Sequence, residues 1–301
     1  MADEILCKGG RPEILPELEI DGDVDSKTGN IDFPGSVSIP GSVREGFQVR
    51  AGRDVEIMET VEGGTVESKA DITINGGVRG AGKGSIVAAG DVKAKFLDQA
   101  YVRCKGNIKI DGPVLNSDVG AQMTVEITGR ESRIVGGKIQ AGADVVCENL
   151  GSEAGEHTEI AVGVPPEHSE RRNELRNLIA ELSDNLTTME TDLEFLKKKH
   201  REGSMDERQR ISMLSMVRGI FELRHILRTR QSELKKLEQS LNLGEPRSVV
   251  KVNGLCHPGV IVTIGDYKYA VGERLDHLTF VYDAEARAIA LRPFDKTQSG
   301  D

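Results

Sequence analysis

The chain has 301 residues, no tryptophan, 4% aromatic residues and a formal net charge of −10 at pH 7. Residues 1–166 carry the excess, with 17 Lys and Arg against 27 Asp and Glu, so this part repels nucleic-acid phosphates and anionic lipid surfaces. No apolar run approaches the roughly 18 residues of a membrane span, and the acidic, Gly-interrupted start is unlike a secretory signal. We therefore expect a cytoplasmic protein that binds no nucleic acid and has no membrane span.

The first elements lead into a repeat. Residues 1–21 are predicted to be an N-terminal lead-in, and Gly22–Ile31 indicates a strand, a polar turn and a return strand. We interpret the latter as a first coil or a cap, because the open end of a stacked β structure presents unpaired strand edges.

Residues 37–145 repeat with a period of about 18 residues. A pair of apolar residues separated by one polar residue recurs at intervals of 18, 17, 20, 16, 17 and 20, and two further apolar series accompany it. The first series is Val37, Val55, Ile72, Val92, Ile108, Val125 and Val145; the second, six residues before its later members, is Val49, Val66, Ile86, Val102, Val119 and Ile139; the third is Val43, Val61, Val78, Leu97, Val114 and Ile134.

This pattern predicts a parallel β-helix over residues 22–166, with three short strands and three corners in each coil. Apolar residues at i and i+2 share one face of a strand, and stacking the coils buries the face that one coil leaves open. The β-branched, Gly-punctuated composition favours this solenoid over helical repeats. An ordinary β-sandwich would not keep several series in step.

Two features of the corners resemble binding sites. Asp54, Asp71, Asp91, Asn107 and Asp144 form a column that could bind metal or sugar, but such residues more commonly close tight corners by bonding their own backbone.

The segment 77–85 resembles a phosphate-binding loop. However, Gly84 separates Lys83 from Ser85 and a strand follows, so we expect a widened corner without nucleotide.

The remaining chemistry-bearing residues favour no enzyme. The four cysteines form no C-x-x-C pair: Cys7, Cys104, Cys147 and Cys256. Cys104 and Cys147 stand in strand-like contexts, so we expect buried, reduced thiols. The six histidines lack metal-ligand spacing, and Cys256 and His257 are strand neighbours that point to opposite faces. We therefore expect no catalytic residue, no cofactor, no metal and no small-molecule substrate.

Residues 167–245 predict an antiparallel coiled-coil hairpin projecting about 45–55 Å. Pro165 and Pro166 end the β pattern, 201–203 break the first helix, and Ser204 with Glu207 predicts a capping box for a second helix that ends by Pro246. The predicted seam consists of Leu175, Ile179, Leu182, Leu186, Met189, Leu193 and Leu196 in the first helix, and Met213, Val217, Ile220, Leu223, Leu227, Leu234, Leu237 and Leu241 in the second.

We interpret the hairpin as a docking or dimerisation arm, with a spacer or packing arm as the alternative. A two-helix seam has little interior, so apolar residues left outside it invite a partner helix. The basic run 197–201 suits a solvated helix end beside a favourable dipole, with an anionic partner as the alternative. The predicted partner-binding residues are Phe195, Lys197, Lys198, Lys199, Met216, Phe221 and Ile226.

After Pro246 the β pattern returns. Residues 246–293 are predicted to complete the β-helix and cap its last strand edge, so that the hairpin interrupts one β architecture, and residues 294–301 are predicted to be a disordered tail.

An ordered set of motifs over about residues 20–293 resembles the flagellar assembly protein A (FapA) family. The motifs include Gly22–Phe33, Gly35–Val43, Asn75–Gly80, Gly90–Phe96 and His257–Val260. The resemblance implies a right-handed parallel β-helix with an inserted coiled coil, in a bacterial cytoplasmic protein that helps to place or assemble flagella, with the cell pole as one location. It supplies no catalytic residues.

The function that we expect is a non-catalytic scaffold or adaptor in flagellar assembly or placement. It would bind other proteins through the hairpin and form a homo-oligomer. One alternative is a self-associating cytoskeletal or morphogenetic scaffold. A second is a polysaccharide-acting β-helix enzyme, which the absence of tryptophan and the low aromatic content disfavour.

Overall fold

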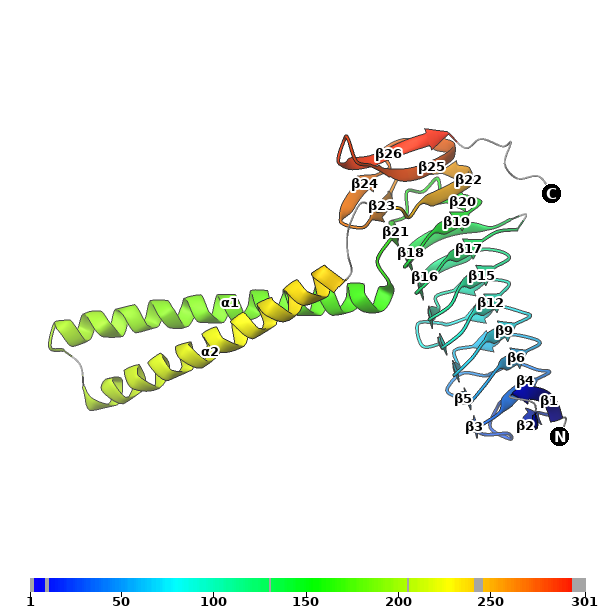
Figure 1. Cartoon of the computed structure of the whole chain (residues 1–301), viewed down its shortest axis with the longest axis horizontal. Helices are drawn as coiled ribbons and strands as arrows, with labels where there is room; N and C mark the ends of the chain where they lie inside the picture. Colours follow the sequence, from blue (N-terminus) through cyan, green and yellow to red (C-terminus); the bar gives the residue numbers. More distant parts are fainter. Residues whose placement is uncertain (1–2, 9–10, 130, 205, 241–245, 294–301) are drawn as a thin grey trace. The chain divides into compact units, whose positions relative to one another are not determined.

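The repeat forms a parallel β-solenoid of about eight turns, seen in Figure 1 as the stack of strands from β3 to β22. The structure is a computed structural model and describes residues 3–8, 11–129, 131–204, 206–240 and 246–293. The chain divides into two compact units, with the solenoid and C-terminal strands in one and the hairpin from Glu167 in the other.

Each turn contributes one strand to each of three parallel ladders, in the chain order first, third, second. The first ladder contains β2 (Arg11–Glu19), β4 (Ser36–Ile39), β6 (Val55–Ile57), β9 (Ile72–Ile74), β12 (Val92–Ala94), β15 (Ile108–Ile110), β17 (Val125–Ile127), β19 (Val145–Cys147) and the start of β22 (Val250–Cys256).

The second ladder contains β3 (Ile31–Phe33), β5 (Gln48–Ala51), β8 (Thr65–Ser68), β11 (Ser85–Ala88), β14 (Tyr101–Cys104), the ends of β16 (Val114–Ala121) and β18 (Arg133–Ala141), β21 (Thr158–Val162) and β23 (Val260–Ile264). The third ladder contains bridges at Val24 and Val43, then β7 (Val61–Glu62), β10 (Val78–Arg79), β13 (Leu97–Asp98), the starts of β16 and β18, β20 (Asn149–Leu150) and the end of β22.

The predicted solenoid is confirmed at the level of single residues. Members of each apolar series stack directly on one another, as in the pair Val55 and Ile72 in the first ladder and the pair Val66 and Ile86 in the second. Every residue of the three series is at most 1% exposed. The β-branched side chains therefore fill the interior in three continuous columns, and each turn supplies the surface that buries its neighbour.

The corner column of Asp and Asn works differently from the prediction. Each side chain bonds the backbone of the following turn, and not its own: the Asp91 carboxylate accepts the amide N–H of Asn107 at 2.7 Å, and the Asp71 carboxylate accepts that of Asp91 at 2.7 Å. The column therefore adds side-chain hydrogen bonds between turns at a corner, next to backbone hydrogen bonds such as that from the Val92 amide N–H to the Asn107 carbonyl.

Loss of one link in this column is expected to destabilise the solenoid. Asp91→Ala should lower the free energy of unfolding by about 1–2 kcal/mol, because the Asn107 amide loses a charged acceptor. Asp91→Asn should stay within about 0.5 kcal/mol of the wild type, since Asn107 itself uses its side-chain carbonyl to accept the Thr124 amide at 3.2 Å. Urea unfolding followed by circular dichroism measures both, and equal losses in the two variants would contradict this role.

The segment 77–85 forms a corner between β10 and β11, as expected. Gly82 has a φ of +72° there, and the Lys83 ammonium lies 2.7 Å from the Glu45 carboxylate of an earlier turn. The lysine thus pairs with a carboxylate of its own chain, which supports the interpretation of a structural corner.

Antiparallel strands cover the C-terminal end of the solenoid, which confirms the predicted cap. β24 (Tyr267–Ala270) pairs with β23, β25 (Leu275–Asp283) pairs with β22, and β26 (Ala288–Pro293) pairs with β25. Phe280 of β25 is fully buried against the core. The predicted tail, residues 294–301, lies outside the described residues.

At the other end, β1 (Asp3–Lys8) pairs antiparallel with β2, and β2 pairs in parallel with β4. The stacking therefore begins within residues 1–21, which the sequence assigned to a lead-in.

Two long antiparallel helices, α1 (Pro166–Arg201) and α2 (Glu207–Ser240), form the hairpin (Figure 1). Leu175, Leu193 and Ile220 of the predicted seam are at most 8% exposed. Ion pairs join the helices, such as Arg176 with Glu238 and Arg224 with Glu190. Neither described helix is apolar enough over sufficient length to cross a bilayer. Leu241 and Gly244, assigned to the end of the second helix, lie outside the described residues.

The predicted capping box at Ser204 and Glu207 is wrong. The Ser204 hydroxyl donates to the Lys199 carbonyl at the end of α1, and the box is formed by Asp206 and Gln209. The Asp206 carboxylate accepts the Gln209 amide N–H at 2.7 Å, and the Gln209 side chain accepts the Asp206 amide N–H at 3.2 Å. Both pairs satisfy the three-residue spacing of the motif, and the chain uses the later one.

Candidate functional site

The seven residues predicted to bind partners all lie on the hairpin, but they do not form one surface. Phe221 and Lys197 line a shallow groove of about 510 Å³ between the two helices. Phe195 belongs to another side of α1, where the Lys199 ammonium lies 4.9 Å from its ring centroid. Met216 is half-buried, one turn before the buried Ile220.

The other two are exposed at separate positions. Ile226 is 44% exposed and lies about a third of a turn round α2 from the seam, on the flank away from Phe221, and Lys198 is exposed on α1. The predicted set is therefore divided between at least two faces of the hairpin.

The structure reveals an apolar stripe on α2 that the sequence analysis identified only at Phe221. The stripe consists of Leu214, Val217 and Phe221, which are 64%, 46% and 76% exposed, with Ile211 at its edge, 61% exposed. Spacings of three and four residues place the three side chains on one face of the helix. Val217, which the sequence assigned to the seam, thus lies mainly outside it. The sequence did contain a signal for this stripe, namely a second series of apolar residues in α2 beside the series that forms the seam.

Charged side chains of α1 border this stripe. Glu190, Glu194 and Lys197 line the groove together with Val217 and Phe221. The Lys197 ammonium lies 2.7 Å from the Glu194 carboxylate, and this hydrogen bond holds the pKa of Glu194 below its ordinary value. The surface therefore combines an apolar stripe on α2 with charges of both signs on α1, which suits a protein partner.

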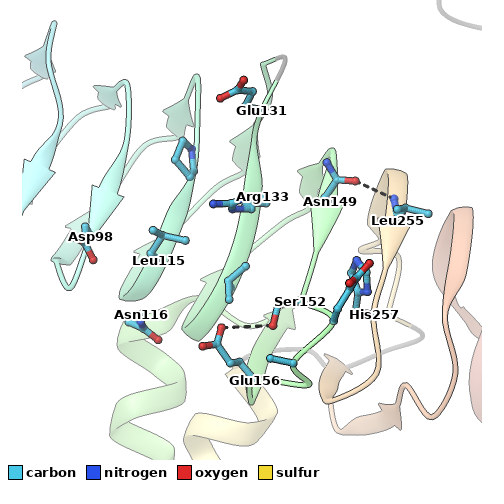
Figure 2. Close-up of a pocket in the computed structure, with 15 residues that line it drawn as sticks. Asp98, Leu115, Asn116, Glu131, Arg133, Asn149, Ser152, Glu156, Leu255 and His257 are labelled. Atoms are coloured by element: carbon cyan, nitrogen blue, oxygen red, sulfur yellow. Dashed lines mark hydrogen bonds between the residues drawn. The ribbon is translucent and has the colours of Figure 1, made fainter.

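A second candidate, which the sequence analysis missed, is a groove of about 880 Å³ on the third-ladder face of the solenoid (Figure 2). The outward side chains of Leu115 and Val135 contribute to its floor, and Glu131 and Glu156 come from the long corners 128–132 and 151–157 on either side of the face. The corner 128–132 is an insertion in the repeat, and the 20-residue interval from Val125 to Val145 was its trace in the sequence, whereas the corner 151–157 lies beyond the last interval of that series.

The polar groups of this groove have mixed charge. Asp98, Glu131, Glu153 and Glu156 line the groove together with Arg133. His257, which is 8% exposed, lies on the side of Asn149 and Leu255 (Figure 2). The hydrogen bonds drawn there serve the fold: Ser152 donates to Glu156 at 3.4 Å, and the Leu255 amide N–H donates to Asn149 at 3.1 Å.

No Phe, Tyr or Trp side chain belongs to the described residues that line this groove. Sugar rings commonly stack on such side chains, so their lack gives a polysaccharide-acting enzyme little support.

In the part of the chain that the structure describes, no group of three or more His, Cys, Asp or Glu side chains could hold a metal ion. The expected absence of metals, cofactors and catalytic residues remains a prediction.

Comparison with known proteins adds one finding. A family model described as the flagellar assembly protein A beta solenoid domain matches residues 16–287, from β2 to the turn that precedes β26. No curated protein matches the chain, and neither does any solved structure.

Proposed function

Because the chain belongs to the flagellar assembly protein A (FapA) family, we propose that it is a non-catalytic scaffold or adaptor in bacterial flagellar assembly or placement. In this role it binds protein partners through the hairpin. The proposal includes a cytoplasmic location, at the cell pole where flagella are polar.

The apolar stripe on α2 is the observation that carries this proposal. Exposed apolar residues are ordinary when they are scattered, but a contiguous stripe on a helix is typical of a protein-binding surface. The solenoid, by contrast, uses its repeat to fill its own interior with side chains that are at most 1% exposed along all three series. A rigid body that carries an arm suits a scaffold better than an enzyme.

The alternative of a filament built by end-to-end stacking has less support. Such stacking needs free parallel strand edges, and at the C-terminal end β24 and β25 cover the last strands β23 and β22. Association through the arm does not meet this obstacle.

The proposed role predicts a flagellar defect that depends on the arm. Cells lacking the gene should lose or misplace their flagella, and the full-length chain should restore them. A version in which a Gly/Ser linker replaces residues 167–245 should not restore them, because the solenoid remains while the binding surface is lost. Flagella are counted and located by electron microscopy.

Two controls make this experiment decisive. The shortened protein must accumulate to the level of the full-length chain and unfold cooperatively on heating. Normal flagella in the cells that lack the gene would overturn the flagellar role, and full rescue by the shortened protein would overturn the role of the arm.

A further inference from the structure

We propose that the groove of about 880 Å³ on the third-ladder face of the solenoid binds an extended segment of a partner protein, and that this segment is rich in lysine or arginine. The described residues that line the groove all belong to the unit formed by the solenoid and the C-terminal strands. The inference therefore goes beyond the proposed use of the hairpin and does not rest on the flagellar role.

The floor of the groove follows a column of outward-facing positions on the third ladder. Asp98 pairs with Leu115, and Leu115 pairs with Val135. Gly151 and His257 continue the column, since the residues immediately before them are paired in register on the same ladder. Five stacked strands, about 4.8 Å apart, span about 19 Å, which is the length of about six residues of extended chain.

Carboxylates on both rims of this floor give the groove an excess of negative charge. Glu131 comes from the corner before the strands, whereas Glu153 and Glu156 come from the corner after them, and Figure 2 shows Glu131 and Glu156 on opposite sides of the face. Among the described residues that line the groove, these three and Asp98 are accompanied by a single arginine, Arg133. The carboxylates of Asp98, Glu131 and Glu153 make no ion pair or hydrogen bond with any residue that the structure describes. The surface that complements this groove is therefore positively charged.

His257 provides independent evidence that the groove holds a ligand, because its side chain is only 8% exposed. The neighbouring Cys256 is buried in the core, so the alternation of side chains directs His257 outwards, into the groove that it lines. Its imidazole has no hydrogen bond to any described residue, although buried polar groups are nearly always hydrogen-bonded. Gly151, its neighbour in the column, has no side chain that could cover the ring. A polar group of a bound ligand would satisfy the imidazole.

The remaining groups of the groove favour a peptide over a simple polycation. The Arg133 guanidinium also makes no ion pair or hydrogen bond with a described residue, and it can act only as a donor. It requires an acceptor, which the backbone carbonyls of a peptide provide and a polyamine lacks. The apolar floor at Leu115 and Val135 suits the methylene stems of Lys and Arg, whose charged ends reach out to the rims. Because successive side chains of an extended segment point to opposite sides, basic residues can reach both Glu131 and Glu153.

Methyl NMR of the full-length chain locates the binding site. The probe is N-acetylated hexalysine amide, and its addition should shift the methyl signals of Leu115, Val135 and Leu255, which line the groove. The signal of Val87 is the control, because this residue is 38% exposed on the second ladder. Spermine is a polycation without an acceptor for Arg133, so it should bind more weakly than hexalysine.

Two charge-matched double variants test whether the rims bind the probe. Glu131→Lys/Glu153→Lys should raise the dissociation constant of hexalysine at least about tenfold, because both rims then repel it. Glu19→Lys/Asp32→Lys makes the same change in net charge at exposed positions of β2 and β3. These positions lie four turns, or about 19 Å, from the turn of Asp98, so at physiological salt this control should change the dissociation constant by less than about threefold. Isothermal titration calorimetry measures both constants.

Each of four results would overturn the proposal: no shift of the groove methyls, an equal shift of Val87, equal weakening in the two double variants, or spermine binding as tightly as hexalysine. Equal weakening would mean that the acidic chain attracts the probe without a specific site, and tight binding of spermine would assign the groove to a polyamine. Because the NMR titration uses the wild-type chain, its result stands even if a variant fails to fold. None of these results bears on whether cells without the gene have flagella.

Discussion

Gly137→Ala is expected to destabilise the solenoid by about 3–5 kcal/mol, close to the whole stability of many domains. Gly137 has a φ of +77°, and a Cβ there would lie 2.3 Å from the Ser117 carbonyl oxygen and 2.6 Å from its amide nitrogen. Those atoms belong to the backbone of the preceding turn, where Ser117 and Gly137 are paired in the ladder. The clash can therefore be relieved only by breaking the stacking, and the strained φ adds its own cost.

A second glycine separates these two effects. Gly46 has a φ of +82°, but a Cβ at this position meets no atom within 4 Å. Gly46→Ala should therefore cost only about 1–2 kcal/mol, which reflects backbone strain without a clash. Thermal and urea unfolding of both variants measures the difference. Equal losses would show that the close approach of turns at Gly137 contributes nothing.

The ladders could be predicted residue by residue because the sequence encodes them redundantly. A parallel stack places every inward residue on its equivalent one turn away, so the interval between Val92 and Ile108 is also their pairing register. Insertions fall in corners, where a longer loop leaves the ladders in step. The order of short apolar pairs is then enough to define the core.

The helix cap and the hydrogen-bond partners of the corner carboxylates could not be predicted in this way, because the sequence offers two similar candidates for each. Ser204 and Asp206 both satisfy the spacing of an N-cap, and only the geometry of the turn decides between them. The Asp91 carboxylate could accept a hydrogen bond from the backbone of its own corner or from that of the next turn. The distance between stacked turns favours the second, so the carboxylate accepts the Asn107 amide N–H.

The candidate sites were hidden for a related reason. Val217 has the spacing of a seam residue, yet the rotation of α2 leaves it 46% exposed beside Phe221. The groove on the solenoid is lined by residues of the corners on either side of Glu131 and of 151–157, which lack any motif, and only the first of these corners lengthens an interval of the apolar series. Both surfaces depend on side chains brought together by the fold, which a periodic pattern does not report.

The chain is also expected to lose stability steeply at alkaline pH, because three thiols are buried in the solenoid. Cys104, Cys147 and Cys256 are free and buried, as the sequence predicts for Cys104 and Cys147, whereas the side chain of Cys7 lies outside the described part. Burial raises the pKa of Cys104 and of Cys256 from 9.0 to about 12, and it raises that of Cys147 further.

The direction of the effect follows from the proton balance. Below about pH 9 each thiol keeps its proton in both states, so its contribution to stability is fully present. Between about pH 9 and 12 the unfolded chain releases protons that the folded chain retains, so each thiol lowers the free energy of unfolding by about 1.4 kcal/mol per pH unit. For Cys104 and Cys256 together this reaches about 8 kcal/mol near pH 12, enough to unfold a typical domain.

The ladder positions supply suitable replacements for a test. Cys104 stacks between Ala88 and Ala121, and Cys147 stacks between Ile127 and Val252. Cys104→Ala and Cys147→Val should therefore fit the core, and the double variant should lose about 2.8 kcal/mol less per pH unit above pH 9 than the wild type. Urea unfolding at a series of pH values from 7 to 11 measures both slopes. Since Lys and Tyr titrate equally in the two proteins, identical slopes would mean that these thiols ionise without leaving the core.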